Sequence, residues 1–430
     1  MRIPRLSLTY AYAAFGVFGL AVFLVSDQSP HRLWGACAAA AYGCAALVSL
    51  TRLRWRRELA LAVAVAGALA VPLCWLAAAG QGMPEVGVVA RSAGLLVSHF
   101  RPYRSAAQLG ADVYGYNPYL PGMTLFGLPR ALFGGGAATD PRVWDALAFA
   151  ASFAAALRIA GRTWSASVWR TALLTASPLI AFPLVVSGND LPVLGLLCLG
   201  LALAARPWAA SLRAVHPAWA GVALGAAAAL KSTAWPALLI VGVLFLVRDG
   251  RGAAARFAGA AAAVLAAIVG PVLVIQPRDL ITNTIAFPLG LTSAHSPAAS
   301  PLPGHLIAAT GPAGHLTVIA LMVAGAAALV ILLVTRPPRT AAAAGAYLAL
   351  ALTMLFTLAP ATRWGYFVYP VGIGCWLWLS GRIPGRTSSP SRVRPPGAHV
   401  TAATTVALAA RGPRDASCST RTMSPCEHAG

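Results

Sequence analysis

The stretch RLRWRRELALAVAVAGALAVPLCWLAAAGQGMPE, residues 52–85, contains the pattern that decides the fold. Its apolar run, 58–79, is long enough to cross a lipid bilayer. The arginines of 52–57 precede that run, and clustered arginine beside a transmembrane segment marks the cytoplasmic end. Glu85, past the other end, is therefore predicted to face outward. Because the chain has only 11 acidic residues among 430, a carboxylate at this place is a candidate catalytic base.

Apolar runs recur along most of the chain. Hydrophobic residues make up 58% of it and charged residues 10%, and the mean hydropathy is +0.72. This composition excludes an ordinary soluble domain and predicts an all-α polytopic integral membrane protein with about 12 or 13 transmembrane helices. The expected spans are 10–25, 34–50, 58–79, 144–159, 171–186, 191–205, 218–230, 234–247, 257–275, 316–334, 340–358 and 366–379.

One further run, 120–133, is broken by Pro121 and Pro129. It is either a full crossing or a re-entrant segment packed within the protein. A crossing would place Arg162 and Arg170 on the outer side, whereas a re-entrant segment leaves every arginine cluster on the cytoplasmic side. The positive-inside rule therefore favours the re-entrant alternative.

The formal charge of +21 comes from arginines that lie mostly between spans and in the tail. Membrane topology and anionic lipids explain this pattern better than a nucleic-acid partner does. Three parts are predicted: two amino-terminal spans with a basic cytoplasmic loop (1–57), a transmembrane core (58–380) and a disordered basic cytoplasmic tail (381–430). Within the core, the long loops 80–141 and 276–315 are expected on the outer face. The sequence has no metal-ligand spacing and no nucleotide-binding motif, so no cofactor is predicted.

Two polar segments follow Glu85 on the predicted outer face. EVGVVARSAGLLVSHFRPY, 85–103, has apolar residues at near-helical spacing and predicts a helix on the membrane surface, either as an interfacial anchor or as a wall of a ligand groove. ADVYGYNPYLPGM, 111–123, places Tyr116 and Asn117 among further tyrosines. Such tyrosines are either interfacial belt residues or sugar-binding residues.

Four more polar residues are predicted to reach the same face. Asn189 and Asp190 precede a span, where they either cap a helix or enter a polar cavity. Lys231, the single lysine of the chain, either snorkels to the interface or marks a site that needs a compact ammonium group. Arg363 stands among aromatic residues and could hold a phosphate by paired hydrogen bonds.

The order and spacing of these segments resemble the GT-C membrane glycosyltransferases, and within them glycosyltransferase family 87. The resemblance covers most of the chain from Glu85 to about residue 380. The first similar block is 85–103, and the others are YNPYLPGMTLFGLP (116–129), SGNDLPVLGLLCLGLALA (187–204) and GVALGAAAALKSTAWPALL (221–239). The chain departs from the family pattern by having Glu85 in place of aspartate, Asn189 in place of glutamine, and two extra amino-terminal spans.

The resemblance implies a GT-C-like bundle with an extracytoplasmic first catalytic loop. It implies inverting transfer of a hexose, typically mannose, from a polyprenyl-phosphate-sugar donor to a hydroxyl of a cell-envelope lipid or glycan, in a bacterial plasma membrane. Glu85 would be the base, and Lys231 and Arg363 would bind the donor phosphate. The residues expected to bind the sugar or acceptor are Tyr103, Tyr116, Asn117, Asn189, Asp190 and Tyr366.

The main rival interpretation is a transporter or flippase for a lipid-linked or polar solute. Transporters tend to place ionisable groups near the bilayer midplane at the interface of internal repeats. The sequence has no visible repeat, and its key charges lie at span ends on one predicted side, which favours a transferase. A catalytically inactive scaffold is a third alternative, because glutamate replaces the family's aspartate.

Overall fold

The computed structural model describes residues 5–109, 112–205, 216–294 and 296–381. Regular structure in these residues is helical, apart from an isolated bridge between Ala299 and Thr362. The predicted tail lies, from residue 382 onward, outside the described residues. The division into three parts stays a prediction.

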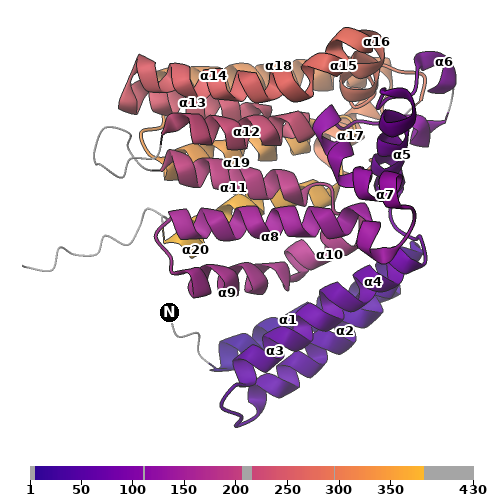
Figure 1. Ribbon diagram of the computed structural model, residues 1–430, viewed down its shortest axis with the longest axis vertical. Helices are drawn as coiled ribbons and strands as arrows, with labels where there is room; N and C mark the ends of the chain where they lie inside the picture. Colours follow the sequence, from indigo (N-terminus) through magenta and orange to yellow (C-terminus); the bar gives the residue numbers. More distant parts are fainter. Residues whose placement is uncertain (1–4, 110–111, 206–215, 295, 382–430) are drawn as a thin grey trace, which may run out of the picture. The chain divides into compact units, whose positions relative to one another are not determined.

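The first helices are labelled in Figure 1 in chain order. Their bounds are α1 Arg5–Val25, α2 Ser29–Leu50, α3 Arg56–Val65, α4 Val71–Ala78, α5 Pro84–His99, α6 Ala106–Leu109, α7 Leu128–Phe133, α8 Pro141–Ile159, α9 Trp164–Thr175, α10 Pro178–Val186 and α11 Leu191–Ala204. A π-helical turn, Ala66–Ala70, joins α3 to α4, and short 3-10 helices cover Val113–Gly115, Pro121–Gly127 and Ala137–Thr139.

The remaining helices complete the bundle. They are α12 Pro217–Leu230, α13 Trp235–Asp249, α14 Arg251–Ile268, α15 Gly270–Ile275, α16 Pro277–Ile281, α17 Pro303–Ala308, α18 Pro312–Thr335, α19 Ala341–Leu358 and α20 Val368–Ser380. Short 3-10 helices cover Ser232–Ala234 and Trp364–Phe367, and a π-helical turn covers Thr282–Ala286. Proline begins many of these helices because its missing N–H has no partner to lose in the first turn.

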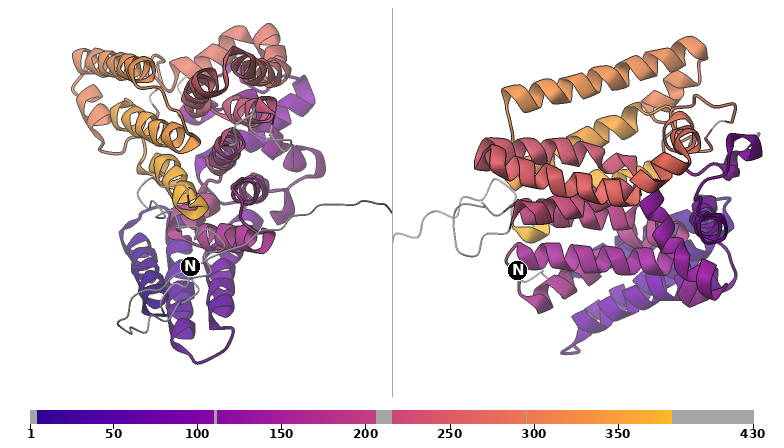
Figure 2. Two further views of the ribbon diagram at one scale, coloured as in Figure 1. Left: turned by 90° about the vertical axis from the view of Figure 1, so that its left-hand side faces the viewer. Right: turned by 45° about the horizontal axis from the view of Figure 1, so that its top comes forward.

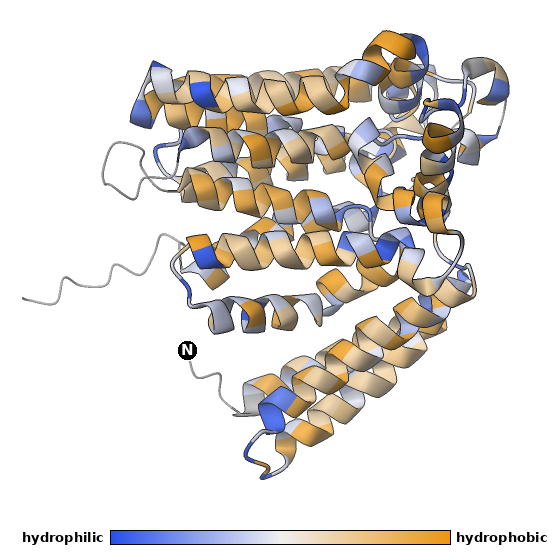
Figure 3. Cartoon of the chain, in the orientation of Figure 1, coloured by the Kyte–Doolittle hydropathy of each residue, from blue (hydrophilic) through white to orange (hydrophobic). Residues whose placement is uncertain are grey.

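Seven helical segments of the described residues are long and apolar enough to cross a membrane on their own. They are Ser7–Val25, Ser29–Leu50, Arg56–Ala78, Ser232–Asp249, Arg251–Ile268, Pro312–Thr335 and Ala341–Leu358. Figure 3 shows apolar residues along these helices and hydrophilic ones mostly near their ends. The prediction of an all-α polytopic membrane protein is confirmed, while the expected number of 12 or 13 crossings stays a prediction. The central helices α11 and α12, with 14 residues each, span only about 21 Å.

The span expected at 171–186 is not one straight helix. It is divided between α9 and α10, which meet at a bend of 68° where Pro178 starts the second helix. Such a break frees main-chain carbonyls at membrane depth. The Tyr42 hydroxyl of α2 donates to the Ala176 carbonyl at 2.6 Å, and the Ser177 hydroxyl donates to the Leu174 carbonyl at 2.6 Å. One of the carbonyls at the bend is therefore hydrogen-bonded by Tyr42, a residue of the amino-terminal helix pair.

The helices of the bundle run between two ends, which Figures 1 and 2 show from different sides. We name them by their turns. The basic end contains the turns 51–55, 160–163, 249–250 and 336–340, and the site end contains 79–83, 187–190, 231–234 and 359–363.

The segment 120–133 does not cross between these ends. It forms a 3-10 helix and then α7, which together reach about 23 Å at most. Arg170 donates to the Leu379 carbonyl, and the position of a Cβ on Gly381 would lie 2.6 Å from Arg162 Nη2. Both arginines therefore lie with the other arginine clusters at the basic end. This arrangement agrees with the re-entrant alternative.

The segment predicted as a surface helix, 85–103, forms α5 up to His99. Figure 1 shows α5 lying across the site end, roughly crosswise to the bundle helices. Its buried face, which includes Val86, Val89 and Ala93, packs on the 3-10 helix Pro121–Gly127 and on α7. A main-chain bond from Met83 N to the Val186 carbonyl, 2.9 Å long, ties the start of α5 to the end of α10. This contact places Glu85 beside the turn that contains Asp190.

Candidate active site

A cavity of about 1060 Å³ opens at the site end. Its polar lining includes the predicted residues Glu85, Asp190, Arg363 and Tyr366, together with Tyr119. Its apolar lining continues along the whole of α10 and reaches α1 and α20, through Phe18, Leu179, Phe182, Val186 and Val371. The cavity therefore joins a charged pocket to an apolar channel.

Glu85 and Arg363 form an ion pair in this cavity. Glu85 stands in the first turn of α5, directly after Pro84, where the helix dipole favours a carboxylate. Arg363 Nη1 lies 2.5 Å from Glu85 Oε1, and their side chains are 26% and 19% exposed. Burial acts to lower the pKa of Arg363, but the Glu85 carboxylate together with Tyr366, Tyr119 and Asp190 outweighs burial and raises that pKa above its usual range. Glu85 Oε2 has no hydrogen-bond partner among the described residues.

Lys231 and Asp190 form the second ion pair. Lys231 is the residue after α12 and is only 8% exposed. Its ammonium group donates to Asp190 Oδ1, which also accepts a 2.8 Å bond from the Tyr369 hydroxyl. The ammonium lies 4.6 Å from the ring centre of Tyr366 and 5.5 Å from that of Tyr119, within cation–π range.

The protonation of Lys231 follows from these neighbours. Burial acts to lower the pKa of Lys231, yet the Asp190 carboxylate, Tyr366 and Glu85 together raise it above its usual value. The side chain is thus an ammonium ion at neutral pH. Lys231 is held inside the protein by a carboxylate and aromatic rings, which differs from the snorkelling alternative.

Asn189 connects the Asp190 turn to the bundle. With its amide oriented to satisfy both ends, the nitrogen donates to the Ser187 carbonyl at 3.0 Å and to Asp145 Oδ2 at 3.2 Å, and the oxygen accepts from the Tyr119 hydroxyl at 3.2 Å. Gly188 has φ of +84°, and a Cβ there would lie 2.6 Å from Asp145 Oδ2. Only glycine fits this turn without strain.

Five of the predicted site residues do not line the cavity: Lys231, Asn189, Tyr103, Tyr116 and Asn117. The Tyr103 hydroxyl donates to the Tyr119 carbonyl at 2.7 Å, and Tyr116 stacks on Phe287 with ring centres 4.4 Å apart. The Asn117 main-chain N–H bonds Asn283, and its side-chain oxygen accepts from Tyr119 N at 3.1 Å. These contacts fix the loop that presents the Tyr119 ring to the cavity.

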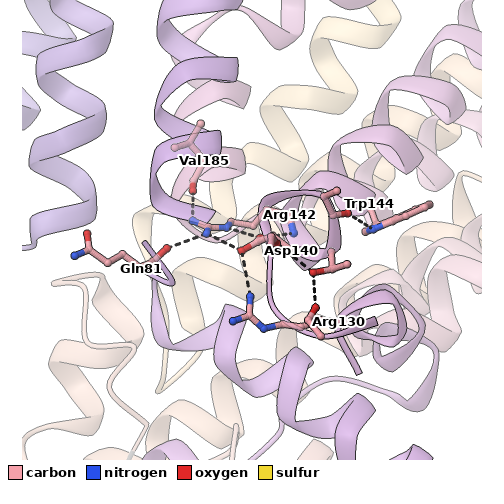
Figure 4. Close-up of polar contacts among 10 residues, drawn as sticks. Gln81, Arg130, Asp140, Arg142, Trp144 and Val185 are labelled. Atoms are coloured by element: carbon pink, nitrogen blue, oxygen red, sulfur yellow. Dashed lines mark hydrogen bonds and ion pairs between the residues drawn. The ribbon is translucent and has the colours of Figure 1, made fainter. Parts of the chain in front are cut away.

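Sequence reasoning missed the buried pair of Asp140 and Arg142, which is drawn in Figure 4. Arg142 is fully buried, and Asp140 is 1% exposed. Asp140 caps α8 by accepting from Arg142 N at 3.0 Å. Two opposite charges next to the expected span 144–159 were a usable signal, because charges at membrane depth need partners.

The geometry can be compared with known proteins. The sequence profile of glycosyltransferase family 87 matches residues 117–358, more than half of the chain. The matched part contains Asn189, Asp190 and Lys231, whereas Glu85 precedes it and Arg363 follows it. No curated protein sequence and no solved structure matches the chain. The chain belongs to glycosyltransferase family 87 and is thus a member of a family of membrane glycosyltransferases.

Proposed function

We propose that this protein transfers a hexose, mannose in the first instance, from a polyprenyl-phosphate-sugar donor to a hydroxyl of a cell-envelope lipid or glycan. The reaction takes place at the outer face of a bacterial plasma membrane and inverts the anomeric carbon. The observation that carries the proposal is that Glu85, Arg363 and Asp190 face one cavity whose apolar channel continues along α10. A charged pocket joined to an apolar channel suits a phosphate attached to a hydrocarbon chain.

The site end is taken as the outer face because the arginine clusters lie at the other end. The turns of the basic end contain or adjoin Arg52, Arg54, Arg162, Arg248 and Arg339. Arginine beside membrane spans favours the cytoplasmic side. A donor whose chain remains in the bilayer can present its sugar at the opposite face without a nucleotide site.

In the proposed reaction, Glu85 accepts the proton of the attacking hydroxyl. The acceptor oxygen forms a bond to the anomeric carbon while the bond from that carbon to the phosphate oxygen breaks, and polyprenyl phosphate leaves with the electron pair. Glu85 Oε2, which has no partner among the described residues, is the oxygen assigned to the proton. General-base assistance of this kind contributes typically about 10² to 10⁴ in rate.

Arg363 has a second role in this scheme. It binds Glu85 through one guanidinium nitrogen and can offer its other N–H groups to a phosphate. A bound phosphate competes with Glu85 for the guanidinium, so donor binding loosens the ion pair and frees the carboxylate to accept the hydroxyl proton. Lys231, paired with the cavity residue Asp190, supplies a further positive charge, and Tyr366 supplies an aromatic face for the sugar. Asp190 then contacts the sugar or acceptor hydroxyls, Asn189 holds the Asp190 turn, and Tyr103, Tyr116 and Asn117 act by holding the Tyr119 loop.

The proposal is tested by transfer of radiolabelled mannose from polyprenyl-phosphate-mannose to a lipid and glycan extract. Purified wild type should transfer label, and Glu85→Gln should lose about 10² to 10⁴ in rate because its amide cannot accept the proton. Glu85→Asp should retain part of the activity. Glu58→Gln, an exposed glutamate in the first turn of α3 at the basic end, is the matched control and should transfer like wild type.

Two outcomes would contradict parts of this proposal. Equal rates for wild type and Glu85→Gln would remove Glu85 as the base. Absence of transfer by inserted, folded wild type would remove polyprenyl-phosphate-mannose as the donor, and the assay would then be repeated with the glucose-carrying donor.

A further inference from the structure

We propose that Arg142 and Asp140 are positioning residues of the transfer site, which hold the turn that leads into Glu85 and the end of α10 that leads to Asp190 in a fixed relation. The inference rests on the proposed function, because the two segments matter through the cavity that they line. Neither residue lines the cavity itself. We name the two side chains the clamp.

The clamp uses the fork of the arginine to make four directed bonds, which Figure 4 shows. Arg142 Nε and Nη2 donate to the two Asp140 carboxylate oxygens at 2.8 and 2.9 Å. Nη1 donates to the Val185 carbonyl at 2.7 Å, and Nη2 donates to the Gln81 carbonyl at 2.8 Å. The carboxylate fixes the plane of the guanidinium, and the remaining N–H groups hold two main-chain segments that are far apart in the sequence.

Both carbonyls lie just before a charged residue of the cavity. Gln81 is followed by the turn into α5 and Glu85, and Val185 by the turn that ends at Asp190. Both turns also pack on the clamp through glycine. A Cβ on Gly82 would lie 3.1 Å from Arg142 Nη1, and a Cβ on Gly188 would lie 3.1 Å from Arg142 Cγ. The position of each turn therefore depends on where this one side chain lies.

Stability alone does not account for an arginine at this place. Arg142 is in the first turn of α8, where the helix dipole disfavours a positive charge. Burying an ion pair also costs desolvation, and apolar residues of similar volume often replace such a pair without loss of stability. An apolar pair could fill the space, but it could not donate hydrogen bonds to two carbonyls, one in the turn before α5 and one in the last turn of α10. The clamp therefore fixes geometry at the cavity.

The chain offers a matched control at the basic end. Arg248 Nε and Nη2 donate to Asp249 Oδ2 at 2.9 and 2.6 Å, and Arg248 Nη1 donates to the Ala204 carbonyl at 2.8 Å. The side chains of Arg248 and Asp249 are 15% and 3% exposed. This pair repeats the chemistry of the clamp, an arginine on a carboxylate and a main-chain carbonyl, at the end away from the cavity.

The first test compares Arg142→Lys with Arg248→Lys. Lysine keeps the charge but cannot bind both carboxylate oxygens and both carbonyls with the planar fork of arginine. Arg142→Lys should lower kcat by about 10- to 100-fold, because a displacement of about 1 Å can cost about 10² in rate. Its KM for the donor should stay near the wild-type value, since the phosphate-binding side chains are unchanged. Arg248→Lys should lower the thermal midpoint to a similar extent and leave kcat within about twofold of wild type.

Two results would overturn the clamp as a positioning device. One is a wild-type kcat for Arg142→Lys. The other is an equal loss of kcat in Arg248→Lys, which would show that any buried arginine of this kind acts through general stability.

A second measurement needs no substrate and separates the clamp from the proposed function. Hydrogen exchange is followed in peptides that cover 79–86 and 185–191, which include the Met83 N–H bonded to the Val186 carbonyl. Exchange in both peptides should be about tenfold faster in Arg142→Lys and unchanged in Arg248→Lys, because local opening depends on the local contacts. Unchanged exchange in Arg142→Lys would overturn the clamp. If wild type transfers no sugar, the proposed function fails and this exchange result still decides whether the clamp holds the two segments.

Discussion

Removing the ammonium group of Lys231 should cost about 3 kcal/mol of unfolding free energy. Breaking a buried ion pair by deleting one partner typically costs about 3 to 5 kcal/mol, because the other charge stays buried and unpaired. In Lys231→Met, Asp190 keeps its 2.8 Å bond from the Tyr369 hydroxyl, and its side chain is 19% exposed. These two facts place the cost at the lower end of the range.

The same reasoning gives a full double-mutant cycle. Asp190→Asn should cost about 2 kcal/mol, because the ammonium then keeps the faces of Tyr366 and Tyr119, 4.6 and 5.5 Å away, as favourable surroundings. The double variant should lose only about 2 to 4.5 kcal/mol, since groups in direct contact couple by about 0.5 to 3 kcal/mol. The unpaired charge that each single variant leaves behind is absent from the double variant.

The assay is reversible denaturant unfolding of the purified protein in detergent micelles, followed by tryptophan fluorescence. Wild type, both single variants and the double variant are measured at one pH and one detergent concentration. If the two single losses add to within about 0.5 kcal/mol in the double variant, the side chains do not act as a pair and the reasoning is refuted.

Two further predictions follow from the backbone and from charge. Replacing Gly188 by alanine should destabilise the protein by at least about 2 kcal/mol more than Gly250→Ala, because both glycines have φ of +84° but only a Cβ at Gly188 would meet another atom, a carboxylate oxygen at 2.6 Å. Equal shifts of the thermal midpoint would contradict this steric reasoning. Because the pKa of Lys231 is raised above 10.5, its contribution is fully present below that value and is lost only as the pH rises through the higher folded pKa. The stability difference between wild type and Lys231→Met should therefore be constant from pH 7 to pH 9.5, and a difference that shrinks over this range would contradict the assigned protonation.

Hydropathy predicted the membrane-spanning character of this chain well but could not predict how its helices break. Hydropathy averaged over a window predicts one span at 171–186, because the proline at 178 lowers the average hydropathy little. The structure bends there by 68°. The bend lies at Pro178, which has no N–H to continue the helix. Tyr42 stabilises the bend, but its position in the sequence does not indicate that contact. Hydropathy also predicted the short helices α11 and α12. It could not predict that they are buried inside the bundle, because their burial depends on which helices pack around them.

Three charged residues predicted for the site, Glu85, Asp190 and Arg363, line the cavity, but the sequence did not predict which charges pair. Glu85 and Arg363 are 278 residues apart, and Asp190 and Lys231 are 41 apart. Sequence placed all of them near span ends on one side, and spacing along the chain does not say which ends meet. Arg142 was missed because a charge beside a span is usually explained by topology. Its two carbonyl partners are main-chain atoms, which no side-chain pattern can indicate.

The hydrogen bond from Tyr42 to the Ala176 carbonyl has a consequence for how much of this chain can be dispensed with. A shortened protein that begins after α2 would expose that carbonyl, at the α9–α10 bend, to hydrocarbon, which costs several kcal/mol. It would also remove the indole of Trp34, which donates to the Ala68 carbonyl at 2.9 Å beside the π-helical turn. The first two helices therefore supply hydrogen bonds that the rest of the bundle needs when it is folded. A protein that begins after α2 should therefore be less stable than the full chain.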